Sequence, residues 1–123
     1  MSDSAPPNND NDQVAANLER MDKLDFEAWN NADWHGLFAH LHTDDVVVDM
    51  KGMPTTRGIA EHIAAMEAFV EMVGGTVPQI VDHPIKFGSG EWTCVVGQSA
   101  DGSRMVTVAK WRDGAIAEEY IWT

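Results

Sequence analysis

The chain has 123 residues, a hydrophobic share of 44% and a formal net charge of -12. A single domain of this length buries roughly two thirds of the surface that its unfolded chain exposes, and so strong a negative charge excludes nucleic acid and anionic membranes as partners. No apolar run reaches the roughly 18 residues of a membrane-spanning helix, and the N-terminus lacks the features of a secretory signal. We therefore expect a cytoplasmic protein.

The chain opens with a polar segment and then a helix. Residues 1–12 are rich in Pro, Asn, Asp and Ser without apolar periodicity, which predicts a disordered tail ahead of one domain at 13–123. Over residues 13–30, apolar residues recur at steps of three and four, as in an amphipathic helix. Asp33 is then suited to cap a short second helix that carries Trp34.

A strand and a third helix follow. The β-branched run at 46–48 is typical of a strand. Thr56 is a suitable N-cap for a helix that runs to about Val73, where Gly74 and Gly75 stop it.

The remainder predicts strands. Residues 77–87 form one candidate, in which Pro84 favours an edge position or a bulge. Residues 92–98, 105–111 and 116–122 form three more, and the turn signals Asp-Gly at 101–102 and 113–114 join them as hairpins. The order of elements predicts an α+β fold, a curved and mainly antiparallel sheet with helices on one face.

Four motifs carry a resemblance to a known family: WNNADW at 29–34, HTDDVVV at 42–48, TRG at 56–58 and WRDGAIAEEY at 111–120. Together they resemble the nuclear transport factor 2-like superfamily and, within it, the SnoaL-like polyketide cyclases, over residues 13–123. The resemblance implies a cone-shaped α+β barrel, with three N-terminal helices packed on the sheet around a deep apolar cavity. Because this superfamily includes cyclases, isomerases, dehydratases, epoxide hydrolases and binding subunits, the fold does not choose an activity.

The resemblance also implies particular residues. SnoaL-like cyclases close a ring by an intramolecular aldol reaction with acid/base side chains and without metal or cofactor, and their acidic residue on the last strand aligns with Glu119. A histidine used by some members falls near Met105. In a ketosteroid isomerase overlay the general base falls at Met50 and the oxyanion donors near Asp25 and Thr107; since Met50 cannot accept a proton, that mechanism does not transfer.

Glu119 is the first candidate catalytic group. Strand alternation separates Glu119 from Glu118 but does not decide which of them faces the cavity; the resemblance favours Glu119. A carboxylate in an apolar cavity is expected to have a raised pKa, which suits proton transfer. The alternative is that both glutamates are solvated.

His62 and Asp25 are the other two candidates. His62 lies three residues after Ile59 and four before Met66, within the apolar stripe of its helix, where imidazole can exchange a proton or polarise a carbonyl group. Asp25 lies on the stripe of the first helix, and sharing a cavity with Glu119 would push the two pKa values apart. The alternatives are a core histidine bonded to backbone and an aspartate at the solvent edge.

Several residues are candidates for the wall of a ligand pocket, although plain core packing is the alternative for most of them. They are Trp34, Met50, Met66, Phe69, Trp92 and Thr107. His83 and Asp49 are weaker candidates for the cavity mouth. His40 and His42, with Asp44 and Asp45, offer groups that can bind a metal, but they cross a helix-to-loop boundary where solvated histidines are ordinary, so we expect no metal site there. The resemblance implies that no cofactor is needed.

These features favour a cofactor-independent acid/base enzyme, an aldol-type cyclase or isomerase, that acts on a small apolar carbonyl compound. Glu119 would move the proton, and His62 or Asp25 would stabilise the enolate oxygen. Two alternatives are a non-catalytic module that binds a small hydrophobic ligand and a dimeric interaction domain with a filled cavity. A homodimer is expected in each case, because alternation places Ile116, Tyr120 and Trp122 on the outer face of the sheet.

Overall fold

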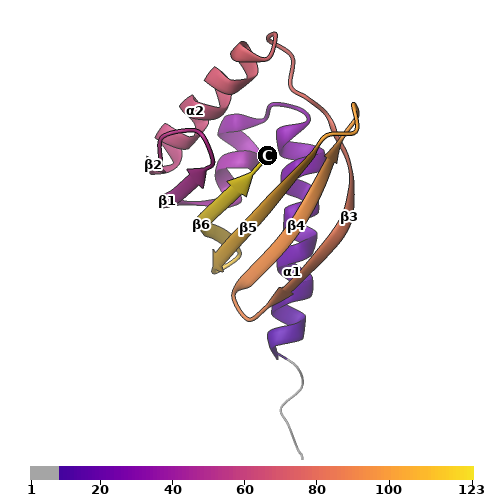
Figure 1. Ribbon diagram of the computed structural model, residues 1–123. Helices are drawn as coiled ribbons and strands as arrows, with labels where there is room; N and C mark the ends of the chain where they lie inside the picture. Colours follow the sequence, from indigo (N-terminus) through magenta and orange to yellow (C-terminus); the bar gives the residue numbers. More distant parts are fainter. Residues whose placement is uncertain (1–8) are drawn as a thin grey trace, which may run out of the picture.

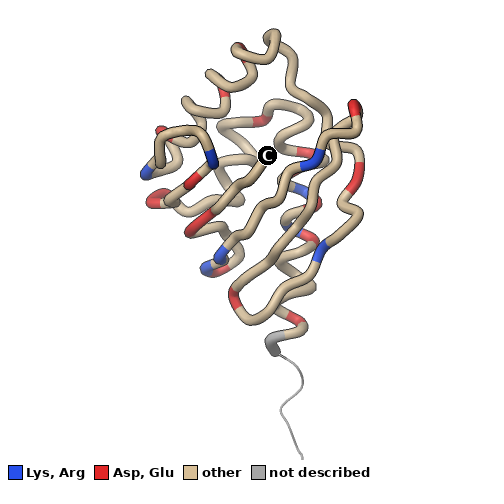
Figure 2. The backbone as a smooth tube through the Cα atoms, in the orientation of Figure 1, with Lys and Arg blue, Asp and Glu red and all other residues tan. Residues whose placement is uncertain are grey.

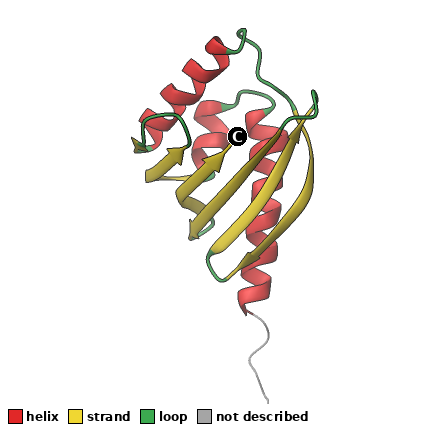
Figure 3. Cartoon of the chain, in the orientation of Figure 1, coloured by secondary structure: helices red, strands yellow, loops and turns green. Residues whose placement is uncertain are grey.

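The computed structural model describes residues 9–123, in which helices lie on one side of a six-stranded sheet (Figures 1 and 3). The helical segments are α1 (Asn9–Lys23), the π-helical turns η1 (Leu24–Trp29) and η2 (Trp34–Phe38), and α2 (Ile59–Met72). The strands are β1 (His42–Met50), β2 (Thr56–Arg57), β3 (Ile80–Ser89), β4 (Trp92–Ser99), β5 (Arg104–Arg112) and β6 (Ala115–Trp122). This order confirms the predicted α+β layout.

The first helix begins at Asn9, four residues before its predicted start, and residues 1–8 of the predicted tail lie outside the described part of the chain. Helix α1 continues directly into η1, where the Asn30 N–H donates to the Asp25 carbonyl, five residues back, at 3.2 Å. The Asp33 carboxylate accepts from the Leu37 N–H at 2.9 Å, so it caps η2 as predicted.

The strand order is β2-β1-β6-β5-β4-β3, with β1 and β6 parallel and every other pair antiparallel. Helix α1 packs on β3 and β4, while α2 packs on β1 and β2. Within residues 9–123 the edge strands β2 and β3 do not pair with each other, so the sheet curves around the helices but is not closed into the expected barrel.

Two sequence signals have the predicted effect. Strand β3 lies at an edge, and its pairing with β4 shifts register between Asp82 and Ile85, on either side of Pro84. Asp113 and Gly114 both adopt positive φ, 53° and 81°, which is the backbone of a type I′ hairpin turn between β5 and β6.

The predicted N-cap at Thr56 is wrong. Thr56 and Arg57 stay extended as β2 beside β1, and the Gly58 N–H donates to the Val46 carbonyl at 2.7 Å. The chain turns into α2 only at Gly58, whose φ of 93° favours glycine.

The predicted outward position of Ile116 is also wrong. The pairing of β5 with β6 shifts between Lys110 and Trp111, so that Trp111 lies opposite Ile116 while Lys110 lies opposite Glu118. This irregularity inverts the alternation at the start of β6, and Ile116 is fully buried in the core.

Among residues 9–123, no helix is long and apolar enough to cross a membrane. Figure 2 shows the acidic residues distributed over helices, strands and loops rather than gathered in one block.

The apolar core lies between the helices and the concave face of the sheet, where the candidate site is also found.

Candidate active site

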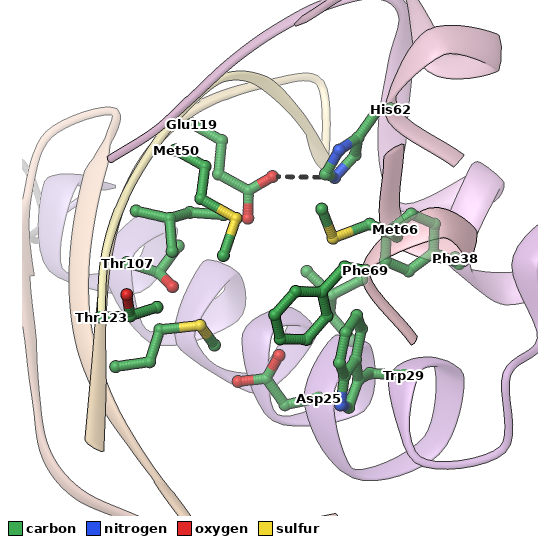
Figure 4. A pocket seen from close by; sticks show the side chains of 13 residues that line it. Asp25, Trp29, Phe38, Met50, His62, Met66, Phe69, Thr107, Glu119 and Thr123 are labelled. Carbon is green, nitrogen blue, oxygen red and sulfur yellow. Dashed lines mark ion pairs between the residues drawn. The ribbon is translucent and has the colours of Figure 1, made fainter. Parts of the chain in front are cut away.

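An inner pocket of about 70 Å³ lies between the helices and the concave face of the sheet (Figure 4). Its wall is mostly apolar, with Asp25, His62, Thr107, Glu119 and Thr123 as the polar side chains. The other lining residues are Leu24, Trp29, Phe38, Met50, Met66, Phe69, Met105 and Ile121.

A larger outer pocket of about 580 Å³ adjoins the inner one, since Trp29, Phe69, Met105 and Thr123 line both. The loop that follows α2 and the ends of β3, β4 and β5 form the rest of its wall. The inner pocket can therefore hold a small reacting group while the remainder of a ligand occupies the outer pocket.

Glu119, and not Glu118, faces the inner pocket. Its side chain is buried, whereas Glu118 on the outer face accepts from the Tyr120 hydroxyl at 2.8 Å and lies 3.7 Å from Lys110. In Figure 4, Glu119 on β6 and Asp25 on η1 lie at opposite ends of the pocket.

Two buried histidines reach the same oxygen of Glu119. The Nε2 atom of His42 lies 3.2 Å from Glu119 Oε1, and Nε2 of His62 lies 3.5 Å from it. The second carboxylate oxygen takes part in neither contact, and Figure 4 shows it turned towards the pocket. These three side chains, which come from β1, α2 and β6, form what we call the Glu119 cluster.

The hydrogen on the His42 ring is fixed by its backbone contact. His42 Nδ1 lies 2.7 Å from the Phe38 carbonyl oxygen, which can only accept a hydrogen bond, so Nδ1 must carry the hydrogen. In neutral His42 the Nε2 lone pair would then point at the Glu119 carboxylate. A hydrogen must therefore lie between Nε2 and Oε1, and it joins the two groups in a hydrogen bond of 3.2 Å.

Burial alone would raise the pKa of Glu119, but the hydrogen bonds and charge of His42 and His62 outweigh it and hold this pKa well below its usual range. The raised pKa expected from the sequence is therefore wrong in direction. An apolar wall by itself raises the pKa of a carboxyl group, and the two histidines that contact this one reverse the shift.

Asp25 belongs to a second histidine–carboxylate network at the other end of the pocket. His83 Nε2 lies 2.7 Å from Asp25 Oδ2, and His83 Nδ1 lies 2.8 Å from Asp22 Oδ1. Asp22 also pairs with Lys86 at 3.0 Å near the surface. His83 packs at a tilt against the Phe26 ring, with the ring centroids 4.4 Å apart, and it does not line the pocket.

Burial raises the pKa of Asp25, the His83 hydrogen bond opposes the rise without cancelling it, and the Glu119 charge adds to it. For His83, burial lowers the pKa, but the hydrogen bonds to Asp25 and Asp22 outweigh it and the net shift is upwards. The pKa values of the two pocket carboxyl groups are therefore shifted in opposite directions, downwards for Glu119 and upwards for Asp25.

The remaining predicted wall residues divide into two groups. Met50, Met66, Phe69 and Thr107 line the inner pocket, as does Met105, the position where some relatives of the SnoaL-like family hold a histidine. Trp34 and Trp92 do not line it. Asp49, the other weak candidate for the cavity mouth, is exposed beside Tyr120 and Trp122.

Trp34 and Trp92 lie outside the inner pocket for different reasons. Trp34 packs edge-on against Trp29 and Phe38, with ring centroids 5.5 and 5.0 Å away, in the layer behind the pocket wall. Trp92 points outward, since it pairs with Lys110 on the convex face of the sheet and stacks on Tyr120.

Sequence reasoning missed His42 as a site residue. Period-two alternation back from the buried Val48 and Val46 places residue 42 on the inward face, and this signal could have found it. The exposed Asp44 and Asp45 beside it favoured a solvated loop instead.

No protein-family model matches the chain, and no curated protein matches it either. Solved structures do. A candidate SnoaL-like polyketide cyclase from Jannaschia sp. CCS1 is 17% identical with a TM-score of 0.75, covering 98% of this chain and 90% of that one. A candidate isomerase of the SnoaL-like family from Agrobacterium tumefaciens C58 is 17% identical with a TM-score of 0.68, covering 90% and 97%.

A candidate ketosteroid isomerase from Kribbella flavida DSM 17836 is 16% identical with a TM-score of 0.70, covering 89% of this chain and 78% of that one. Other matches are described as NTF2-like proteins of unknown function. The chain has the nuclear transport factor 2-like fold of the SnoaL-like proteins. At these identities the likeness establishes the fold, and an activity has to be argued from the site.

The opposite pKa shifts predict opposite pH effects on stability. Because the folded-state pKa of Glu119 is depressed, its stabilisation is present above its unfolded pKa near 4.5 and is lost as pH falls. Glu119→Gln should lower the free energy of unfolding by about 3 kcal/mol at neutral pH, the order found when one partner of a buried ion pair is removed. The difference in free energy of unfolding between the wild type and the variant, measured by urea unfolding, should become smaller below about pH 4.5.

Asp25→Asn is the matched comparison. Because the pKa of Asp25 is raised on folding, the contribution of this group to the free energy of unfolding is favourable at low pH and is lost as pH rises. The variant should therefore gain stability relative to the wild type as pH increases. Parallel pH dependence of the two variants would contradict the assigned charge states.

Proposed function

We propose that the protein is a cytoplasmic, cofactor-independent enzyme that moves a proton at a carbon next to a carbonyl group, in a small compound with an apolar body. One observation carries the proposal: two buried carboxyl groups stand at opposite ends of one apolar pocket, each bonded to a buried histidine. An isomerisation or an aldol-type ring closure both begin with this proton transfer.

In the first step Glu119 is the base. Its pocket-facing oxygen takes the proton as the C–H bond breaks, and the electron pair moves into the new C=C bond of the enolate. Asp25, in its protonated form, donates a hydrogen bond to the oxygen on which negative charge develops, a role that its raised pKa supports. Where the substrate gives a conjugated dienolate, return of the proton from Glu119 to its far carbon gives an isomer. Where the enolate attacks a second carbonyl carbon, the ring closes and the new alkoxide takes the proton back.

The histidines have supporting roles in this step. His42 and His62 hold Glu119 Oε1 and keep the carboxylate ionised inside a pocket whose apolar wall disfavours charge. Because the same contacts lower the pKa of Glu119 and so weaken it as a base, the proposed proton transfer depends on the position of its free oxygen. His83 holds Asp25 from behind. A positioned acid or base contributes about 10²–10⁴-fold in rate, and the mostly apolar wall of the pocket strengthens both interactions.

The size of the pockets indicates the shape of the substrate. About 70 Å³ accepts only a small reacting group, and the adjoining outer pocket accepts an apolar remainder of greater length. The descriptions of two matched structures, as a candidate polyketide cyclase and a candidate ketosteroid isomerase, are consistent with carbonyl substrates.

A non-catalytic binding module is the second candidate. Methionine stands on the pocket wall at Met50, where the isomerase base would align, and at Met105, where some relatives of the SnoaL-like family have a histidine. Saturable binding of small ketones without proton exchange would favour this function.

We also propose a homodimer formed through the convex face of the sheet. Adjacent strands align apolar side chains there, and Phe87, Trp92 and Trp122 are exposed on it, while Ile116 is withdrawn from the face. Sedimentation at micromolar concentration should give the mass of a dimer, and Phe87→Glu with Trp122→Glu should give a monomer. A monomeric wild type would contradict the proposal.

The function is tested by deuterium exchange at the carbon next to the carbonyl of small cyclic ketones and β-diketones in D₂O, followed by NMR. Glu119→Gln should slow enzyme-dependent exchange by about 10²-fold or more because the base is lost. The rate should fall as pH rises through the raised pKa of Asp25, and this alkaline limb should be absent in Asp25→Asn.

His35→Gln is the control, since His35 is exposed and lies outside both pockets. It should exchange at the wild-type rate. Exchange that is equally fast in Glu119→Gln and in the wild type would remove Glu119 from the mechanism.

A further inference from the structure

We propose that the Glu119 cluster is a binding site for one divalent transition-metal ion, held by His42 Nε2, His62 Nε2 and Glu119 Oε1. This inference goes beyond the proposed function, which uses the same side chains without a metal. It rests on the positions of three ligand atoms and on the hydrogen carried by one ring.

The distances suit a metal ion. Glu119 Oε1 lies 3.2 Å from one imidazole nitrogen and 3.5 Å from the other, and the three candidate ligand atoms all lie within 4.8 Å of one another. Ligands held about 2.0–2.1 Å from a tetrahedral zinc ion are separated by about 3.3 Å. A cation can therefore bind at their common centre with small side-chain movements.

The donor set selects the kind of metal. Two imidazole nitrogens and one carboxylate oxygen form the ligand set of catalytic zinc sites and of non-haem iron(II) sites. Magnesium and calcium prefer all-oxygen ligands and are disfavoured. Zn²⁺, Fe²⁺, Co²⁺ and Ni²⁺ are the ions expected to bind.

The backbone prepares His42 as a ligand. The Phe38 carbonyl holds the hydrogen on Nδ1 at 2.7 Å, so the Nε2 lone pair points at the cluster, as in metal-bound histidines whose other nitrogen is anchored by a carbonyl group. His62 Nδ1 is buried and has no hydrogen-bond partner within residues 9–123. In the metal-free protein His62 Nε2 faces the accepting oxygen Glu119 Oε1 at 3.5 Å, so binding of the ion requires the His62 hydrogen to move from Nε2 to Nδ1.

The surroundings favour a cation with an open coordination position. A buried carboxylate and a fixed imidazole lone pair meet at one point, which is unfavourable unless a positive charge lies between them. Within residues 9–123 the cluster supplies three protein ligands, and two of them, His62 and Glu119, line the inner pocket, which leaves a further position for water or for a carbonyl or hydroxyl oxygen. The ligands stand on β1, α2 and β6, which are regular elements rather than loops.

The test is a titration of chelator-treated full-length protein with Co²⁺, in excess Ca²⁺ to occupy surface carboxylates, followed by the visible d–d absorption of the ion. The wild type should bind one equivalent, and Zn²⁺ should displace it. His62→Gln and Glu119→Gln should each weaken Co²⁺ binding by about 100-fold or more, since each removes one of three ligands.

Two matched controls should bind Co²⁺ as the wild type does. His40→Gln removes an exposed histidine near the cluster in sequence, and Asp25→Asn removes a buried carboxylate of the same pocket that is not a ligand. Circular dichroism checks that each variant is folded. If the ligand variants do not fold, anomalous scattering from a Co²⁺-soaked wild-type crystal locates the ion directly.

Absence of saturable binding by the folded wild type, wild-type affinity in both ligand variants, or an anomalous peak at another site would each overturn the metal site. Deuterium exchange catalysed by the chelator-treated, metal-free protein distinguishes a failure of this proposal from a failure of the proposed function. Exchange that persists in chelator supports the metal-free mechanism whether or not Co²⁺ binds.

Discussion

The hydrogen bond from His42 Nδ1 to the Phe38 carbonyl determines the chemistry of the pocket. Because a carbonyl oxygen only accepts, it fixes the ring hydrogen on Nδ1 and directs the other nitrogen at Glu119, 3.2 Å away. A lone pair and a buried carboxylate cannot face each other without a positive charge between them. The site therefore needs a positive charge between the two groups. This charge is a proton in the acid/base mechanism and a metal ion when the Glu119 cluster binds one.

The fold maintains this arrangement at a cost in stability. Two carboxyl groups are buried in one apolar pocket, and each is compensated by histidine from a different element. The π-helical turn η1 carries Asp25 at the junction between α1 and the rest of the helical layer, and such turns are frequent at functional sites. A pocket built for packing alone would hold hydrocarbon at these positions, since buried ion pairs seldom add stability over apolar residues.

The sequence predicted most of the architecture because its signals are local. Helical periodicity, the Asp33 cap, Pro84 and the Asp113–Gly114 turn each act within a few residues. Three predictions were wrong because non-local contacts decided the outcome. Strand pairing keeps Thr56 extended, a register shift turns Ile116 inward, and contacts from distant segments lower the pKa of Glu119. His42, His62 and Glu119 are separated by 20 and 57 residues along the chain, and only the folded sheet brings them together.

The most direct test of this account is the position of the hydrogen on His42. Long-range ¹H–¹⁵N NMR of histidine-labelled, chelated protein resolves the two ring nitrogens, and the His42→Gln variant assigns the signals. We expect a hydrogen on Nδ1 at neutral pH and a second hydrogen between Nε2 and Glu119 Oε1. A bare Nδ1 with the only ring hydrogen on Nε2 would contradict it.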